Sequence, residues 1–210
     1  MATVKQLLDY CTTQEKASIT YTASKMIICI HSDAGYANEK NARSRAGGHF
    51  FLSNNDQHPP NNGAIMTNAT IIKTVMSSAA EAELGAKFLN AKEGVYLRQI
   101  LTKMGHPQPR TPIQTDNTKA EGIINNKIQP KWTKAMDMRF HWLRDLEAQG
   151  QFRTHWRPGK MNLADYFTKH HPPAHHVNVR TEFLTKVKDL AEARDQRNNG
   201  QTKSHISQSK

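Results

Sequence analysis

Hydrophobic and polar positions along the 210-residue chain fall into short strand-like runs and longer helix-like stretches. Runs rich in β-branched and aromatic residues, bounded by Gly, Pro and Asn, predict strands. The expected strands are residues 26–36, 47–54, 63–68, 111–116 and 151–158. Helical spacing and end signals predict helices. The expected helices are residues 79–105, 117–126, 133–150, 161–169 and 177–195. This order of elements indicates a mixed α/β layer architecture.

Two polar stretches are expected to lack regular structure. Residues 37–48, "ANEKNARSRAGG", are predicted to be a loop between the first two strands. Residues 170–176, "HHPPAHH", offer His171 and His175 at the spacing of a helical metal pair. Two prolines between these histidines oppose the helix that would align them. We therefore interpret this segment as a linker.

The fragment "MSSAAEAELGAKFL", residues 76–89, places two glutamates in an otherwise apolar helix. Ser77 or Ser78 followed by Glu81 fits a capping box at the helix start. Glu81 and Glu83 are separated by about 200° around a helix with 3.6 residues per turn, so they cannot both face one site. Apolar residues follow both faces, and hydrophobic periodicity therefore does not say which glutamate points inward.

Three aspartates stand at or just after predicted elements. Asp33 ends the first strand, Asp116 ends the strand 111–116, and Asp165 lies in the short helix 161–169. Sites in open α/β sheets gather beyond the carboxyl ends of strands. Carboxylates that converge repel one another, and oxygen-only ligands favour magnesium or manganese. Taken singly, the three residues could instead be a turn residue, an N-cap and a solvated helix residue.

Five blocks of the sequence together resemble a known family. They are "HSDAGY…SRAGGHFFL", "SSAAEAELGA", "PIQTDNTKAEGII", "TKAMDMRFHWLRD" and "RPGKMNLADYFTK". Over about residues 26–170, the chain resembles the ribonuclease H domain of copia-type (LTR) retrotransposon polyproteins. The resemblance implies an α/β ribonuclease H-like fold with a five-stranded mixed sheet flanked by helices. It also implies an endonuclease that hydrolyses the RNA strand of RNA–DNA hybrids and leaves 5′-phosphomonoesters.

The same resemblance assigns a catalytic and metal-binding quartet, which consists of Asp33, Glu83, Asp116 and Asp165. The "ELGA" pattern gives the glutamate's role to Glu83 and leaves Glu81 as a helix cap. Two Mg²⁺ ions, with Mn²⁺ as a substitute, are the implied cofactors. Asp33 is expected to bridge both ions, Asp116 to bind the ion on the water side, and Asp165 with Glu83 to hold the other. The histidine loop of cellular ribonucleases H is replaced by the short connection "RPGKMNL", which predicts slow turnover.

The net charge of +11 favours a polyanionic partner such as nucleic acid. The alternative is a neutral domain with a basic tail. Candidate contacts to an RNA–DNA hybrid are Asn117, Lys134, Arg139, His141 and Arg157. Each also has a structural interpretation: Asn117 could cap a helix, and the basic residues of 133–150 could line a solvated helix face. His155, on a predicted strand, is a weak further candidate for the site.

We divide the chain into a tether at residues 1–25, a catalytic domain at 26–170, a linker and helix at 171–195, and a basic tail of disordered composition at 196–210. The resemblance makes a reverse transcriptase domain of the parent polyprotein a possible partner. Two cysteines, no signal-peptide pattern and no long apolar run predict an intracellular location without membrane contact, in a cytoplasmic retroelement particle or the nucleus.

Two other functions remain open at this point. One is a nucleic-acid-binding module of the same fold with weak catalysis. The other is an integrase-like polynucleotidyl transferase, although that family closes its site with a glutamate where this chain has Asp165.

Overall fold

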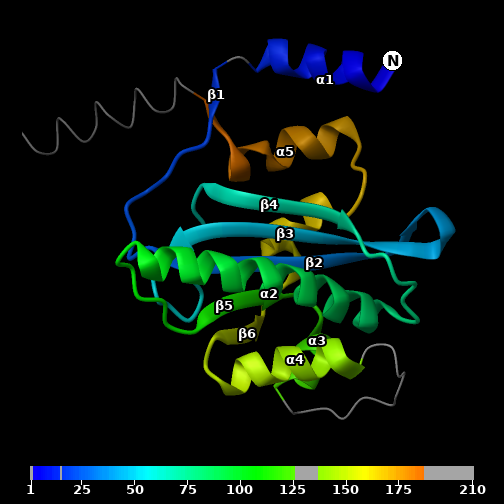
Figure 1. Cartoon of the computed structure of the whole chain (residues 1–210). Coiled ribbons are helices and arrows are strands. Elements are labelled where there is room, and N and C mark those ends of the chain that lie inside the picture. The colour runs from blue at the N-terminus through cyan, green and yellow to red at the C-terminus, as the bar shows by residue number, and fades with distance from the viewer. Residues whose placement is uncertain (1, 15, 126–136, 187–210) are drawn as a thin grey trace, which may run out of the picture. The chain divides into compact units, whose positions relative to one another are not determined.

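The structure is a computed structural model that describes residues 2–14, 16–125 and 137–186 (Figure 1). Two compact units are formed, one by Thr22–His175 and the other by Met1–Tyr21 with His176–Lys210. The second unit contains α1 (Ala2–Thr13) and a small antiparallel pair of strands, β1 (Ala17–Ser18) with β7 (Thr185–Lys186). The predicted tail at 196–210 lies outside the described residues.

The larger unit is built on a five-stranded mixed sheet with the order β4-β3-β2-β5-β6. The strands are β2 (Ile27–Glu39), β3 (Arg43–Ser53), β4 (Ala64–Ile71), β5 (Thr111–Thr115) and β6 (Phe152–Trp156). β2, β3 and β4 pair antiparallel, whereas β5 pairs parallel with both β2 and β6. The predicted five-stranded mixed sheet is confirmed.

One face of the sheet is covered by the long helix α2 (Ala79–Lys103), and α3 (Thr118–Ile124) and α4 (Asp137–Ala148) pack beside it (Figure 1). Alternate β2 residues, Ile28 and Ile30, point into this layer and belong to the hydrophobic core. A Cβ at Gly94 would lie 2.7 Å from Ile30 Cδ1, so glycine allows α2 to approach the strand closely. The core therefore lies between α2 and the sheet.

The opposite face of the sheet carries polar side chains beneath irregular segments. It bears Cys29, His31 and Asp33 of β2, because successive strand residues alternate between faces. The loop after β3 returns along it, with Ser53 Oγ donating to the Pro60 carbonyl at 2.7 Å. Two 3₁₀ turns, η2 (Gly159–Met161) and η3 (Leu163–Phe167), complete the cover. This polar layer contains the candidate site.

Residues 37–48 are not a loop, and the prediction for them was wrong. β2 and β3 continue as a long hairpin that turns at η1 (Lys40–Ala42). Arg45 Nε donates to Glu39 Oε1 at 2.6 Å across this hairpin. Because this part of the hairpin is largely exposed, its pairing leaves no clear apolar alternation in the sequence. Asp33 consequently lies within β2 rather than at its end.

Two helical predictions also need correction. Residues 161–169 form η3 and part of η2 in place of one short α-helix. The last helix, α5 (Pro173–Phe183), begins earlier than the predicted 177–195, within the segment interpreted as a linker. Pro173 is tolerated there because the first helical position needs no backbone N–H. Residues 187–195 lie outside the described part. Within residues 2–14, 16–125 and 137–186, no helix is long and apolar enough to span a membrane.

Candidate metal centre

Asp33 is the central acid of the candidate site. It is 5% exposed, and it lies opposite Gly47 of β3 in the sheet register. A Cβ at Gly47 would lie 2.4 Å from the Ala164 carbonyl oxygen, so glycine lets η3 pack against this end of the strand. Thr168 Oγ1, which follows η3, donates to Asp33 Oδ2 at 3.0 Å. The strand and η3 together fix the position of the Asp33 carboxylate.

The first turn of α2 separates the two glutamates as predicted. Ser78 is the N-cap, and its Oγ accepts a hydrogen bond from Glu81 N. Glu81 in turn accepts from the Ser77 backbone N–H at 2.5 Å. Glu83 is 6% exposed; its Oε1 accepts from Ala34 N at 3.2 Å. Glu81 therefore caps the helix, while the Glu83 side chain points towards Asp33 and Asp116.

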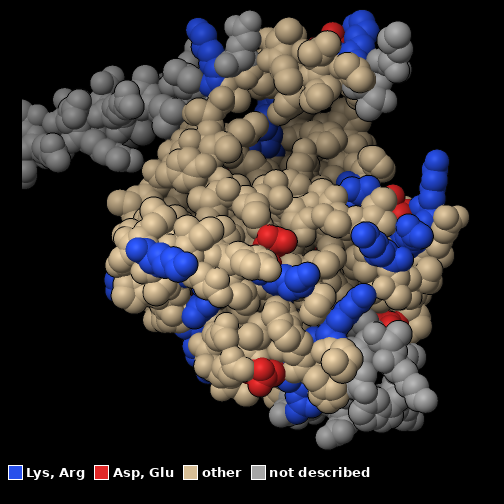
Figure 2. All heavy atoms as spheres, viewed as in Figure 1, with Lys and Arg blue, Asp and Glu red and all other residues tan. Residues whose placement is uncertain are grey.

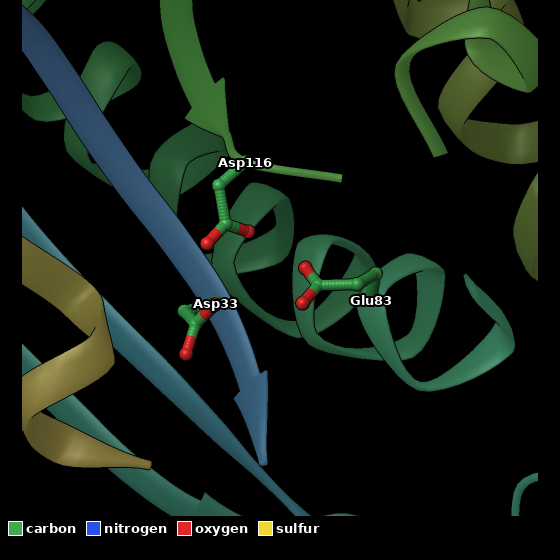
Figure 3. A group of neighbouring side chains, drawn as sticks. All are labelled: Asp33, Glu83 and Asp116. Atoms are coloured by element: carbon green, nitrogen blue, oxygen red, sulfur yellow. The ribbon is translucent and has the colours of Figure 1, made fainter. Parts of the chain in front are cut away.

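The side chains of Asp33, Glu83 and Asp116 converge from β2, α2 and the end of β5 (Figure 3). One carboxylate oxygen from each lies within 4.8 Å of the others. Burial and then Asp116 and Asp165 raise the pKa of Asp33 to about 6. Burial, followed by Asp33 and Asp116, raises the pKa of Glu83 well above its usual value. Crowded acids of this kind are stabilised by a bound cation.

The donor set suits a hard divalent cation. All the converging ligand atoms are carboxylate oxygens, the donors preferred by magnesium and manganese. Glu83 Oε2 is buried without a hydrogen-bond partner among the residues that the structure describes. An unsatisfied buried carboxylate oxygen is costly, and a cation at the cluster would satisfy it. The residues present therefore fit a metal centre.

Asp165 lies beside the cluster and pairs with a lysine. Its Oδ1 accepts from Lys169 Nζ at 2.6 Å, four residues further along the chain. Asp165 is not among the three converging oxygens, yet its charge raises the pKa of both Asp33 and Asp116. Thus three of the four predicted acids come together, and the fourth is close enough to act on them electrostatically.

The sequence analysis did not predict two buried residues near the acids, Thr168 and Lys87. Thr168, 1% exposed, contacts Asp33 and lies three residues after Asp165. Lys87, also 1% exposed, lies one turn after Glu83 on α2. Spacing from the predicted acids was the available signal for both. A lysine within a helix is usually expected at the surface, and this expectation hid Lys87.

The predicted hybrid contacts are only partly described. Asn117 Oδ1 accepts from Ala120 N at 3.0 Å and so caps α3. Arg139 Nη2 donates to Thr74 Oγ1 at 3.2 Å and its guanidinium lies over the Phe88 ring. His141 is exposed, and Arg157 is half-buried after β6. Lys134 lies outside the described residues. Their contacts with a hybrid stay predictions.

The histidines considered from the sequence lie outside the acidic cluster. His155 is on β6, and neither ring nitrogen has a hydrogen-bond partner within the described ranges. Burial, followed by Arg153, lowers the pKa of His155 to about 4. The rings of His171 and His175 stack at a centroid distance of 4.1 Å, near Tyr166. These histidines do not complete the three-acid group.

Comparison with solved structures identifies the class of fold. A ribonuclease H1 isolated from compost by a metagenomic approach, LC11-RNase H1, superposes with a TM-score of 0.52 at 13% identity. The match covers 68% of this chain and 93% of that one. A structure of LC11-RNase H1 in complex with RNA/DNA hybrid gives a TM-score of 0.47, at 13% identity, over 67% and 93% of the two chains. The fold is that of ribonuclease H.

Comparison by sequence relates the chain to a mobile element. No family model matches it. It is 26% identical over 166 residues to the retrovirus-related Pol polyprotein from transposon TNT 1-94 of Nicotiana tabacum. This match covers 79% of the chain but 12% of the polyprotein, so the chain spans only a small part of this relative. The predicted resemblance to the ribonuclease H domain of a retrotransposon polyprotein is confirmed.

Proposed function

We propose that the chain is a metal-dependent endoribonuclease, derived from a retrotransposon, that hydrolyses the RNA strand of RNA–DNA hybrids. The observation that carries this proposal is the convergence of Asp33, Glu83 and Asp116 within 4.8 Å on a ribonuclease H fold. A fold alone does not define an activity. Here the three acids bring carboxylate oxygens together, an arrangement that a metal-dependent hydrolase would use to bind cations.

The three converging acids and Asp165 would hold two magnesium ions, for which manganese could substitute. Such ions, when bound, supply activation of a water nucleophile and stabilisation of charge on the phosphodiester. The chain's own residues prepare the site for them. Thr168 orients the Asp33 carboxylate, and the Ala34 backbone N–H orients Glu83. Burial excludes bulk water from both carboxylates, which strengthens their interaction with cations.

The charge of the chain supports a nucleic acid substrate. Figure 2 shows Lys and Arg side chains spread over the α2 side of the molecule, with few acidic side chains between them. Phosphate contacts by such residues supply affinity and orientation. We assign this role to Arg139, His141, Arg157 and Lys134, and a second role beyond capping to Asn117. A reverse transcriptase domain of a parent polyprotein is a proposed partner, since the sequence relative is a Pol polyprotein.

A cleavage assay on the full chain tests the proposal. Labelled RNA–DNA hybrid, single-stranded RNA and duplex DNA are incubated with magnesium or with EDTA. We expect 5′-phosphorylated products from the hybrid RNA strand alone, and only with magnesium. Equal attack on duplex DNA, strand-transfer products, or cleavage in EDTA would contradict it. The Asp116→Asn chain, purified in parallel, must be inactive if the cleavage belongs to this protein.

One observation favours a second candidate, a hybrid-binding module with weak catalysis. Asp165 is paired with Lys169, and the buried Lys87 lies on the same helix as Glu83. In this candidate, both lysines would compete with cations for the acids. Tight binding of hybrid without cleavage, at any magnesium or manganese concentration tested, would support this candidate over the first.

A further inference from the structure

Lys87 is a charged side chain buried in the core side of α2. It is 1% exposed, and its Nζ has no hydrogen-bond partner in the described part of the chain. Burying an ammonium without partners costs several kcal/mol, because its hydration is lost. A nearby negative charge is the physical means of offsetting that cost. The surroundings of Lys87 therefore indicate what the side chain does.

Burial lowers the pKa of Lys87, and three carboxylates oppose this shift: Glu83, then Glu147 and Glu121. All three accept at least one hydrogen bond, and Glu83 Oε1 accepts from Ala34 N at 3.2 Å. Glu147 accepts from Thr154 N at 3.1 Å, and Glu121 Oε1 accepts from Asn125 Nδ2 at 2.6 Å. Glu83 differs, since its Oε2 is buried and has no hydrogen-bond partner within the described residues. Its charge is the least satisfied of the three.

Helical spacing places Lys87 and Glu83 on the same face of α2. Residues four apart on a helix are neighbours, and a glutamate that precedes a lysine by four residues is the favourable orientation. Burial lowers the pKa of Lys87 to about 8, so the amine still carries its charge at neutral pH. A buried ammonium thus lies one turn from a buried carboxylate of the acidic cluster, and within the described residues neither Lys87 Nζ nor Glu83 Oε2 has a hydrogen-bond partner.

We propose that Lys87 is a built-in counter-charge of the acidic cluster, which weakens its binding of divalent cations. This inference rests on the proposed metal-dependent function. Like charges repel most strongly in a buried, weakly screened site. The ammonium offsets part of the repulsion among the acids when no metal is bound, and it opposes the entry of a divalent cation. Lys87 therefore sets the cation concentration at which the site fills.

Manganese binding to the full chain, followed by calorimetry and by the electron paramagnetic resonance of free Mn²⁺, tests this inference. Lys87→Met keeps an unbranched side chain and removes the charge. We expect Lys87→Met to lower the dissociation constant for Mn²⁺ roughly tenfold or more. The matched control is Lys92→Met, an exposed lysine five residues along the same helix, which should bind as the wild type does. Lys87→Leu provides a second variant if the first does not fold.

The outcomes separate this inference from the function on which it rests. If the wild type binds Mn²⁺ and both Lys87 variants bind it equally or more weakly, the inference is overturned but the metal-dependent function is not. An equal gain of Mn²⁺ affinity in Lys92→Met and Lys87→Met would also overturn the inference, because the loss of one positive charge anywhere on the helix would then explain the gain. An absence of Mn²⁺ binding in every variant would overturn the metal-dependent function as well.

Discussion

Two adjacent rows of residues on the polar face of the sheet contain buried titratable groups of different kinds, histidines in one and acids in the other. One row crosses the strands through His49, His31, Gln114 and His155, which are neighbours in the register. The other, which we call the acidic row, lies two residues further along β2; it contains Asp33, which is joined by Asp116 from the end of β5 and by Glu83 from α2. Both rows are covered by η3 and its flanking turns. The two rows therefore have similar cover, but one holds histidines and the other holds carboxylates.

Three members of the histidine row, His31, His49 and Gln114, are hydrogen-bonded by the protein itself, whereas His155 has no hydrogen-bond partner within the described residues. His31 Nδ1 accepts from Leu163 N at 3.2 Å, and His49 Nε2 lies 3.0 Å from Asn61 Oδ1. Gln114 Nε2 donates to the Met161 carbonyl at 2.7 Å. Burial lowers the pKa of both His31 and His49, so these rings stay neutral. A buried histidine can discard its charge and keep its hydrogen bonds.

The acidic row cannot be satisfied in the same way. Its carboxylates crowd one another, and burial and mutual repulsion raise the pKa of Asp33 and Glu83. Perturbed acids that converge in a site are typical of functional centres, whereas neutral buried histidines are typical of structural layers. The comparison predicts that changes in the acidic row alter activity, and that changes in the histidine row alter stability.

The largest expected effect is that of Asp33→Asn. We expect hybrid cleavage to fall by about 10²–10³-fold or more, because an electrostatic group at the reacting centre is lost. In EDTA at pH 7.5, the same variant should have a higher free energy of unfolding, by an amount on the order of 2 kcal/mol, because a buried charge that its neighbours repel is removed. Cleavage assays and urea unfolding measure the two effects. A destabilised Asp33→Asn chain would break the comparison.

The two glutamates of α2 provide a matched pair for the next effect. Glu83→Gln should lower cleavage at least about 100-fold, by the same electrostatic argument. Glu81→Gln should retain activity and lose about 1 kcal/mol of stability, because Glu81 accepts the Ser77 N–H at the helix start. Steady-state cleavage and thermal unfolding compare the variants. Equal loss of activity in both would mean that Glu83 has no special place at the site.

The pH dependence of stability sharpens the comparison further. Lowered folded-state pKa values at His31, His49 and His155 mean that stability falls as the pH drops through about 6.5, where the unfolded chain binds the extra protons. The raised pKa of Asp33, about 6, acts in the opposite direction: folded protein binds the proton first, so stability is gained as the pH drops from about 6 towards 4.

Variants of each row should separate these two contributions. Urea unfolding in EDTA at pH 7.5, 6.0 and 4.5 is the measurement. Between pH 6.0 and 4.5, Asp33→Asn should lose stability more steeply than the wild type, and His155→Gln less steeply, each by an amount on the order of 2 kcal/mol. Parallel curves for all three chains would show that neither row titrates as described.

Much of this architecture could be predicted from the sequence, because the strands and α2 carry strong patterns. The capping residues Ser78 and Glu81 follow a known signature, and the order of strands and acids suggested convergence. The resemblance to a known family was needed to choose Glu83 over Glu81, since apolar residues flank both faces of α2. Local chemistry thus located the helix start, and only the family pattern selected the inward acid.

Other features could not be predicted because they depend on tertiary packing. The exposed end of the β2–β3 hairpin has polar residues on both sides, so no alternation marks it. Lys87 is buried on a helix that packs against the sheet, α3 and α4, and the sequence of α2 alone does not show this packing. The position of Asp165 beside the cluster, paired with Lys169, depends on how η3 packs against Gly47.

The smallest expected effect concerns Thr168, whose hydroxyl lies 3.0 Å from Asp33 Oδ2 and 2.8 Å from the Asp165 carbonyl oxygen. Thr168→Val keeps the shape and removes the hydroxyl, and Thr168→Ser keeps the hydroxyl. Groups that orient a metal ligand are worth roughly 10–100-fold in affinity or activity. We expect about tenfold weaker Mn²⁺ binding in the valine variant and near wild-type binding in the serine variant.

A purely structural role for Thr168 would give a different result. The hydrogen bond from Thr168 lowers the pKa of Asp33, in opposition to burial. Its removal should therefore raise this pKa further and move the acid limb of the cleavage pH profile to higher pH. Loss of stability without a shift of this limb would assign Thr168 to packing alone. A shift in Thr168→Val that Thr168→Ser does not share would instead show that the Thr168 hydroxyl keeps Asp33 ionised for the metal.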